Sequence, residues 1–259
     1  MTGTQKGIKI AAIVLAIFII CIIINGIIML IGSLGYSKGN VNYSEEYSNI
    51  RRIEIDLNTT NLEIKYGDKY SVEASNVTDK FKVRERNGNL YIEEDSFWLF
   101  GNNNAGEVVV YVPDVLKELS IDVGAGKTSI TGVSAQEFSL DYGAGVISIN
   151  DSDFTNSEID GGTGDVNINN TIFTNLELDT GVGEFNFNGQ ILGRNEINVG
   201  IGECNLSLTG GEELYTLNFD KGIGNIVLNG TDYGRASYGN GNNIINIDNG
   251  IGDVSITFI

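Results

Sequence analysis

The sequence predicts an all-β protein, a parallel β-helix or β-solenoid of about seven coils, with an N-terminal β cap and one transmembrane α-helix before it. Three observations predict this architecture. A Gly-x-Gly step recurs with a fixed period, apolar and polar residues alternate after each step, and a long apolar run without charge lies near the N-terminus. A fixed period of this kind is typical of one structural unit stacked on itself.

Seven copies of the Gly-x-Gly step, each followed by the apolar-polar alternation, lie between residues 124 and 252. The first five copies are 19 residues apart and the last two follow after steps of 22 and 28 residues; they begin at Gly124, Gly143, Gly162, Gly181, Gly200, Gly222 and Gly250. We interpret these glycines as corners between strands, because glycine tolerates positive φ and close approach of backbones. A phosphate-binding loop does not fit, because strands follow the glycines, with no helix N-terminus and no Lys-Ser/Thr pair.

Four columns of side chains recur with the period of the repeat, and we expect them to face a shared core. They are Thr128, Ile147, Val166, Phe185, Cys204, Ile226 and Val254; Ile130, Ile149, Ile168, Phe187, Leu206, Leu228 and Ile256; Ile121, Leu140, Ile159, Leu178, Ile197, Phe219 and Ile247; and Ala135, Phe154, Phe173 and Leu192. One coil buries too few apolar side chains to offset the entropy of ordering its backbone, so the coils are expected to fold as a continuous stack.

The N-terminal region predicts a membrane anchor. Residues 10–31 form an uncharged apolar run that as a helix would be about 33 Å long, enough to cross a hydrocarbon core of about 30 Å. A cleaved signal peptide is the alternative, but the run is longer than a usual signal core and no small-x-small cleavage site follows. Lys6 and Lys9 precede it, so residues 1–9 are expected in the cytoplasm and the large domain outside the cell membrane, in a single-pass arrangement.

The composition agrees with an exported acidic domain. All 34 Asp and Glu residues follow residue 44, and the net charge is −18. Such a surface repels nucleic acid and suits contact with cationic peptides, metal ions or neutral wall polymers. The chain has no histidine, and its two cysteines, Cys21 and Cys204, fall in different compartments, so no disulfide is expected. No catalytic residue and no cofactor site are expected.

The remaining segments complete the predicted domain organisation. Residues 32–48 are polar and contain Gly and Ser, which indicates a linker. Residues 49–120 alternate as strands without the repeat, and we interpret them as a cap that covers the edge of the first coil. Residues 121–259 hold the solenoid repeats.

These features together resemble the bacterial putative-adhesin family of unknown function that includes LiaG-like envelope proteins. The resemblance rests on the anchor, the stretch Val110-Tyr-Val-Pro113 leading into Leu119-Ser-Ile121-Asp122, and the repeated glycine coils, and it covers residues 50–259. It implies a membrane-anchored β-solenoid that accompanies envelope-stress systems. It carries over no catalytic residues.

Two polar ladders are the candidate sites. The first lies two residues before each glycine step, and its cation-binding candidates are Asp122, Asp141, Asp160 and Asp179, continued by Asn198, Asp220 and Asp248. These carboxylates either cap the amides of their own glycine turns or bind a cation such as Ca²⁺, although the calcium-binding β-roll has a different period. The second ladder is Asn150, Asn169, Asn188 and Asn229 beside Thr131, which we interpret as satisfying buried turn amides.

The sequence favours a non-enzymatic surface module that binds an envelope protein, a wall polymer or a cationic peptide. A structural protein that assembles end to end through its C-terminal coil is the alternative, because the chain ends in strand sequence, Val254-Ser-Ile-Thr-Phe-Ile259. A polysaccharide-acting enzyme is disfavoured, because the basic residues Lys127, Arg194, Lys221 and Arg235 share no column with the aspartates.

Overall fold

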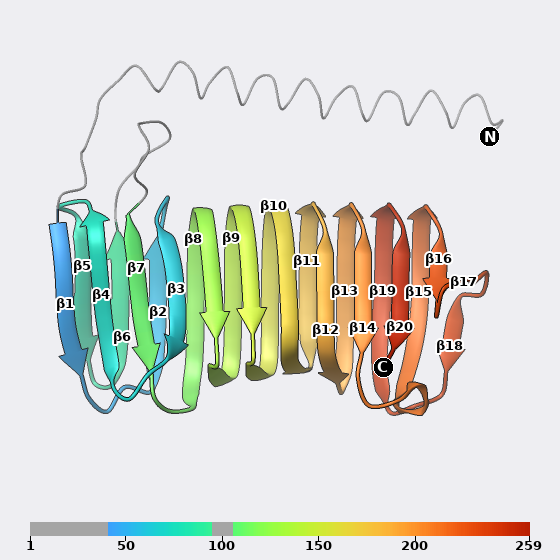
Figure 1. Cartoon of the computed structure of the whole chain (residues 1–259), viewed down its shortest axis with the longest axis horizontal. Helices are drawn as coiled ribbons and strands as arrows, with labels where there is room; N and C mark the ends of the chain where they lie inside the picture. The colour runs from blue at the N-terminus through green and yellow to red at the C-terminus, as the bar shows by residue number, and fades with distance from the viewer. Residues whose placement is uncertain (1–40, 95–105) are drawn as a thin grey trace, which may run out of the picture. The chain divides into compact units, whose positions relative to one another are not determined.

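The computed structural model describes residues 41–94 and 106–259 of the chain. These residues form an all-β structure in which the strands of successive coils lie side by side (Figure 1). Within these two ranges no helix is long and apolar enough to cross a membrane. The predicted cytoplasmic segment 1–9, the predicted transmembrane helix 10–31 and residues 32–40 of the predicted linker lie outside the described residues.

The 19-residue repeats form the centre of the stack, as predicted. Leu140 pairs with Ile121 on one side and with Ile159 on the other, which is the register of the sequence repeat. We call side A the strand segments that precede the glycine steps, and side B the segments that follow them. The strands of these coils are β8 (Leu116–Thr131), β9 (Ser134–Asn150), β10 (Asp153–Thr174), β11 (Leu176–Val182), β12 (Phe185–Leu192), β13 (Arg194–Ile201) and β14 (Cys204–Leu208).

The glycine corners align from coil to coil. Gly145 lies between Gly126 and Gly164 in register, and its φ is 151°. A Cβ at Gly145 would lie 1.9 Å from the carbonyl oxygen of Gly126. Because that oxygen belongs to the backbone of the adjacent coil and cannot move away, only glycine fits this corner.

The core lies inside the coils, where three of the four predicted columns are buried along their whole length. In the fourth column the rings of Phe154 and Phe173 stack with centroids 5.5 Å apart, and Phe138, from outside the column, stacks on Phe154 at 4.2 Å. The prediction that Leu192 ends this column is wrong. A register shift between Asn169 and Thr171 pairs Phe173 with Ile191, which is the buried residue.

The N-terminal region differs from the predicted cap, because it adds two coils to the stack. β2 lies between β6 and β8 on side A, and β3 lies between β7 and β8 on side B. Residues 41–47, predicted as linker, form a strand that pairs with β4. The strands here are β1 (Val41–Tyr47), β2 (Arg52–Leu57), β3 (Asn61–Tyr66), β4 (Tyr70–Val77), β5 (Phe81–Arg86), β6 (Asn89–Glu94) and β7 (Glu107–Val112).

The last two coils are stacked in the reverse of their chain order. On side A, β19 lies between β13 and β15, and on side B, β20 lies between β14 and β16. The glycine corners therefore follow the order Gly200, Gly250, Gly222. The elements are the 3-10 turn η1 (Glu212–Leu214) and the strands β15 (Tyr215–Ile223), β16 (Ile226–Leu228), β17 (Thr231–Asp232), β18 (Ser237–Gly239), β19 (Asn243–Ile251) and β20 (Val254–Phe258).

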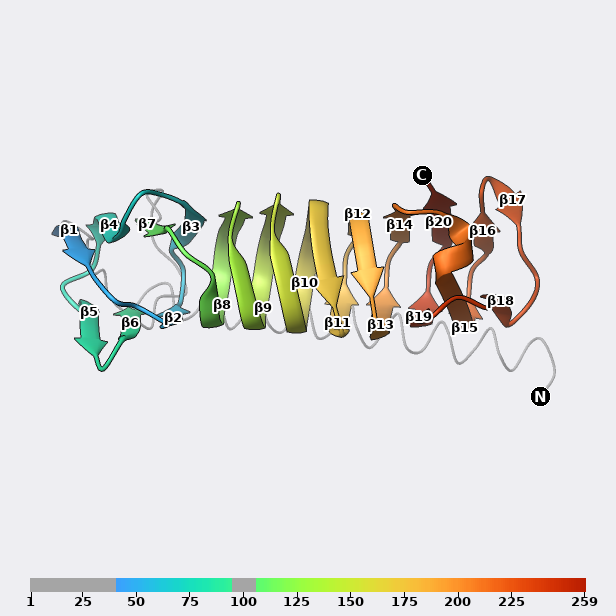
Figure 2. The same ribbon diagram turned by 90° about the horizontal axis from the view of Figure 1, so that it is seen from below.

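Antiparallel strands close both ends of the described stack (Figure 2). β4 and β5 cover the outer coil at the N-terminal end, and β17 and β18 cover the outer coil at the C-terminal end. Short or reversed strands of this kind protect a sheet edge from pairing with another chain. The C-terminal coil is bonded on both sides, so it does not present the bare edge that we predicted for end-to-end assembly. Self-association itself stays a prediction.

An acidic groove on side A

The four predicted aspartates come together on the outer face of side A. Asp122, Asp141, Asp160 and Asp179 are register neighbours on β8, β9, β10 and β11. They lie along a shallow groove of about 510 Å³. The other residues that line it are Tyr142, Gly143, Gly161, Gly162, Thr180 and Gly181. The repeat period thus places one carboxylate on each strand, at intervals of about 4.8 Å.

The acidic ladder is longer than the sequence repeat indicated. Asp56 on β2 pairs with Asp122, and Glu93 on β6 pairs with Asp56. Both residues were missed because they lie before the first glycine step. A signal was present, since Ile53-Glu-Ile55-Asp-Leu57 has the same alternation as Leu119-Ser-Ile121-Asp-Val123. At the other end the ladder continues through Asn198, Asp248 and Asp220, in that spatial order.

The predicted bonds between these aspartates and their own glycine turns do not form. Within the described ranges, Asp122, Asp141, Asp160 and Asp179 accept no hydrogen bond and form no ion pair. Capping is instead done by residues beyond the glycine corners. Asn61 accepts a hydrogen bond from the amide of Lys127 at 3.1 Å, and Asp165 accepts one from the amide of Glu184 at 3.2 Å. The groove carboxylates therefore face solvent without compensation.

The electrostatics of the groove are clearest at Asp141. Partial burial raises the pKa of Asp141 above its ordinary value, and the charges of Asp160 and Asp122 raise it further. Two unit charges about 4.8 Å apart repel by roughly 1 kcal/mol in a water-like dielectric. A cation placed over the ladder would remove this repulsion between neighbours.

Tyr142 lies under the groove as its only aromatic residue. Its side chain is about nine-tenths buried, at 5% exposure, and its ring lies against Gly161 on the next coil. Burial raises the pKa of Tyr142 to about 12, and the charge of Asp165 acts in the same direction. The phenol is therefore neutral over the physiological pH range and serves as a rigid wall beside the carboxylates.

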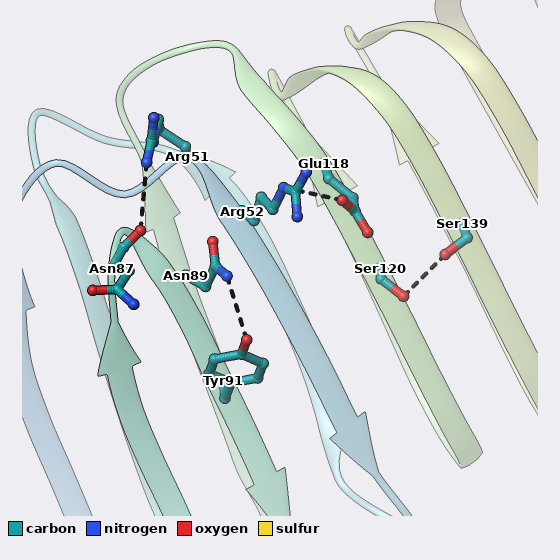
Figure 3. A network of polar contacts seen from close by, with 8 residues as sticks. All are labelled: Arg51, Arg52, Asn87, Asn89, Tyr91, Glu118, Ser120 and Ser139. Atoms are coloured by element: carbon teal, nitrogen blue, oxygen red, sulfur yellow. Dashed lines mark hydrogen bonds and ion pairs between the residues drawn. The ribbon is translucent and has the colours of Figure 1, made fainter.

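A second acidic groove, of about 370 Å³, lies beside the first on side A. Its acidic residues are Glu118, Glu137, Glu158 and Glu177. Glu118 forms an ion pair with Arg52 at 3.2 Å, and Ser139 donates a hydrogen bond to Ser120 at 3.0 Å (Figure 3). The hydroxyl of Ser157, which lines the groove and is buried, has no hydrogen-bond partner.

The arrangement suits contact with an extended cation better than coordination of one metal ion. Among the described residues, no three Asp, Glu, Cys or His side chains converge as a metal site would require. A linear ladder offers a single ion at most two neighbouring carboxylates, whereas Ca²⁺ takes six to eight oxygen ligands. Cys204 is buried and its pKa is raised to about 12 by burial, so it is not a reactive thiolate.

Stacked parallel coils with glycine corners, closed by antiparallel strands and carrying a groove lined by Asp122, Asp141, Asp160 and Asp179, define a β-solenoid of the type predicted. The chain belongs to the Toastrack DUF4097 family, whose model matches residues 115–257, more than half of the sequence. This confirms the resemblance to a putative-adhesin family of unknown function.

Several solved structures are similar to this chain. One is a putative cell adhesion protein from Clostridium sporogenes, 15% identical, with a TM-score of 0.38 over 85% of this chain and 100% of that chain. A putative lipid binding protein from Parabacteroides distasonis is 16% identical, with a TM-score of 0.48 over 86% of this chain and 98% of that one. A putative adhesin from Bacteroides fragilis is 11% identical, with a TM-score of 0.35 over 85% and 96%. No curated protein matches the chain significantly.

Proposed function

We propose that this protein is a non-enzymatic binding module of the bacterial cell envelope, and that the acidic groove on side A contacts a cationic partner. The observation that carries the proposal is the row formed by Asp122, Asp141, Asp160 and Asp179, which has no intramolecular partner in the described ranges. A folded protein that holds like charges in a row gains free energy when an oppositely charged ligand binds them.

A lysine- or arginine-rich peptide segment is the ligand class that fits best. An extended chain carries successive cationic side chains, and the ladder presents one carboxylate on each strand over four neighbouring strands. The long-range field also favours this partner, because the net charge of −18 attracts cations from a distance. Peptides that damage membranes are often rich in Lys and Arg, which fits the proposed role as an accessory protein in envelope stress.

The absence of an enzymatic role is part of the proposal. The sequence has no histidine, and the described cysteine is buried with a raised pKa. The carboxylates of the groove stand in a row with no arginine or lysine among the residues that line it. Glycoside hydrolysis uses two carboxyl groups, one kept protonated by its surroundings and the other ionised. A row of equivalent carboxylates does not provide this difference.

The proposed location is the outer face of the cell membrane, with residues 10–31 as a single-pass anchor. The support is the length of the apolar run and the position of Lys6 and Lys9 before it. Protease added to intact spheroplasts should remove the domain that follows the anchor and leave the N-terminus protected. Full protection of that domain would contradict the proposed orientation.

Binding can be measured with the full-length chain in detergent micelles and a fluorescent decalysine peptide. We expect saturable binding whose affinity falls steeply as salt rises, because the contacts are between exposed charges. The triple variant Asp122→Asn, Asp141→Asn, Asp160→Asn should bind at least about tenfold more weakly, the equivalent of about 1.4 kcal/mol.

The matched control removes the same charge from the other side of the glycine corners. It is the triple variant Asp165→Asn, Glu184→Gln, Glu203→Gln, whose members directly precede the register neighbours Val166, Phe185 and Cys204. Its affinity for decalysine should stay close to that of the unmodified chain. Equal losses in the two triple variants would mean that only net charge matters, and the groove would then not be the binding site.

A further inference from the structure

Two neighbouring columns on the outer face of side B carry no charge over six consecutive strands, in a chain that holds 34 acidic residues. Two columns of hydroxyl and amide side chains run along it in register. The first is Ser129, Ser148, Asn167, Asn186, Asn205 and Ser255, and the second is Thr131, Asn150, Asn169, Asn188, Ser207 and Thr257. We call these twelve residues the amide face.

The amide face has charged borders. The column nearest the glycine corners on side B carries Asp165, Glu184 and Glu203. At the N-terminal end, β3 contributes the ion pair between Lys65 and Glu63, at 2.9 Å. The neutral surface is therefore a bounded strip within an acidic molecule.

The asparagines of this face differ in part from the predicted ladder. Asn150, Asn169 and Asn188 are in register beside Thr131 as expected, but Asn169 and Asn188 are exposed and satisfy no buried turn. Asn229 is outside the ladder, because its φ is 47° and its side-chain Oδ1 accepts a hydrogen bond from the backbone amide of Phe258 at 3.1 Å.

Several asparagines of the amide face bond to one another before any ligand arrives. Asn186 donates from its amide nitrogen to the Oδ1 of Asn167 at 3.1 Å, and Asn205 donates to the Oδ1 of Asn186 at 2.9 Å. A binding surface normally loses side-chain entropy on contact, and for these asparagines that entropy is already lost on folding. An ordered polar surface of this kind binds at a lower entropic cost than a mobile one.

The ladder bonds leave much of the hydrogen-bonding capacity unused. A side-chain amide has two N–H donors and two carbonyl lone pairs, and one ladder bond takes only one of each. Asn186 also donates to the Oε2 of Glu184 at 3.4 Å. The remaining donors and lone pairs lie next to the hydroxyls of Ser129, Ser148 and Thr131 in the same columns. The matching ligand both donates and accepts hydrogen bonds at short intervals, as a chain of hydroxyl-bearing sugars does.

Charge disfavours polyanions and polycations as ligands of this face. The net charge of −18 repels anionic polymers, and cations are drawn to the carboxylates of side A. The length and width of the strip also suit a linear neutral polymer. Successive strands are about 4.8 Å apart and the two columns about 6.7 Å apart, so that six strands offer a strip about 24 Å long.

We propose that the amide face is a second binding surface, and that its ligand is a neutral, hydroxyl-rich polysaccharide lying along the stack. The contacts are hydrogen bonds from the two columns to sugar hydroxyls. Because this surface is on side B, it is separate from the groove proposed to bind cationic peptides.

The test uses the full-length chain in detergent micelles and affinity electrophoresis through gels that contain dextran, hydroxyethyl cellulose or a soluble β-glucan, with polygalacturonate as the anionic control. We expect retardation by at least one neutral polymer and none by polygalacturonate. The variants Asn186→Leu and Asn169→Leu should weaken that retardation about tenfold, because each removes a set of hydrogen bonds. Asn186→Ser, which keeps a hydroxyl, should lose less.

The matched control is Asp160→Asn on side A, which should leave polysaccharide binding unchanged, while Asn186→Leu should leave decalysine binding unchanged. Thermal melting of each variant separates loss of fold from loss of binding. The proposal is overturned if no neutral polymer retards the unmodified chain, or if folded Asn186→Leu and Asn169→Leu bind as well as it does. It is also overturned if sedimentation shows that side B pairs with a second copy of the chain and that the leucine variants abolish this pairing.

Discussion

The ring of Tyr142 occupies the space that a side chain at Gly161 would need. The two residues are register neighbours on β9 and β10, and a Cβ at Gly161 would lie 2.1 Å from Cζ and 2.2 Å from the hydroxyl oxygen of Tyr142. The neighbouring residues in this column are Val123 and Thr180. One large residue and one glycine thus share a volume that two medium-sized residues fill elsewhere in the stack.

This pairing predicts strong coupling between the two positions. Gly161→Val should destabilise the fold by about 1 to 3 kcal/mol, because the added side chain overlaps the Tyr142 ring. In the double variant Tyr142→Val, Gly161→Val, the loss should be smaller than the sum of the two single losses. Denaturant unfolding of all four proteins measures the coupling, and simple additivity would contradict the packing described.

The glycine corners predict a contrast between two glycine substitutions. Gly145→Ala should cost more than about 2 kcal/mol, because its φ is positive and its Cβ would meet a backbone oxygen of the adjacent coil. Gly234→Ala is the control, since no atom lies within 4 Å of a Cβ there. Thermal melting should show a lower midpoint for the first variant alone. Equal midpoints would mean that the corners are not packed as described.

The reversed order of the last two coils predicts which cysteine pairs can be cross-linked. Asn205 is the direct neighbour of Ser255, whereas Val227 lies one strand beyond Ser255. In a Cys21→Ser background, Asn205→Cys with Ser255→Cys should form a disulfide on oxidation, because adjacent strands are within the Cα separation of up to about 6.8 Å that a disulfide spans.

The pair Asn205→Cys with Val227→Cys is the control for this experiment. Its positions are two strand spacings apart, about 9.6 Å, which is too far for a disulfide. Gel mobility without reductant distinguishes the oxidised products. If the second pair formed the disulfide and the first did not, the last two coils would be stacked in chain order, and the reversed order described here would be wrong.

The acidic ladder predicts how stability changes with pH. The folded-state pKa of Asp141 is raised above its ordinary value by burial and by Asp160 and Asp122. Between the unfolded and the folded pKa the folded state binds more protons, so this residue lowers the stability as the pH rises through that window. Its destabilising contribution is fully present above the folded pKa and absent below the unfolded pKa of about 3.9.

Asp141→Asn should therefore melt at a higher temperature than the unmodified chain at pH 7, and the difference should shrink as the pH falls toward 3. Asp232→Asn on β17, outside the ladder, is the control and should show no such trend. Melting curves recorded between pH 3 and pH 7 provide the test. A pH-independent difference for Asp141→Asn would show that charge repulsion is not its cause.

Much of the fold follows from the sequence because the repeat is long and regular. The period places Ile121, Leu140 and Ile159 in one column, and the structure pairs them in that register. The four groove aspartates were predicted for the same reason. Asp56 and Glu93 were not, because the coils that contain them lack a glycine step, and strand alternation alone does not say which strand lies beside which.

The sequence by itself determined the inward columns, the glycine corners and the acidic row, since each depends on local alternation and on a period repeated many times along the chain. Only the tertiary structure decided the order of the coils at the two ends. There β2 lies between β6 and β8, and β19 lies between β13 and β15, so the spatial order differs from the chain order. The physical reason is that every coil offers the same backbone hydrogen bonds and a similar apolar interior. The choice of neighbour therefore depends on which order lets antiparallel strands cover both ends, and that is a property of the whole stack.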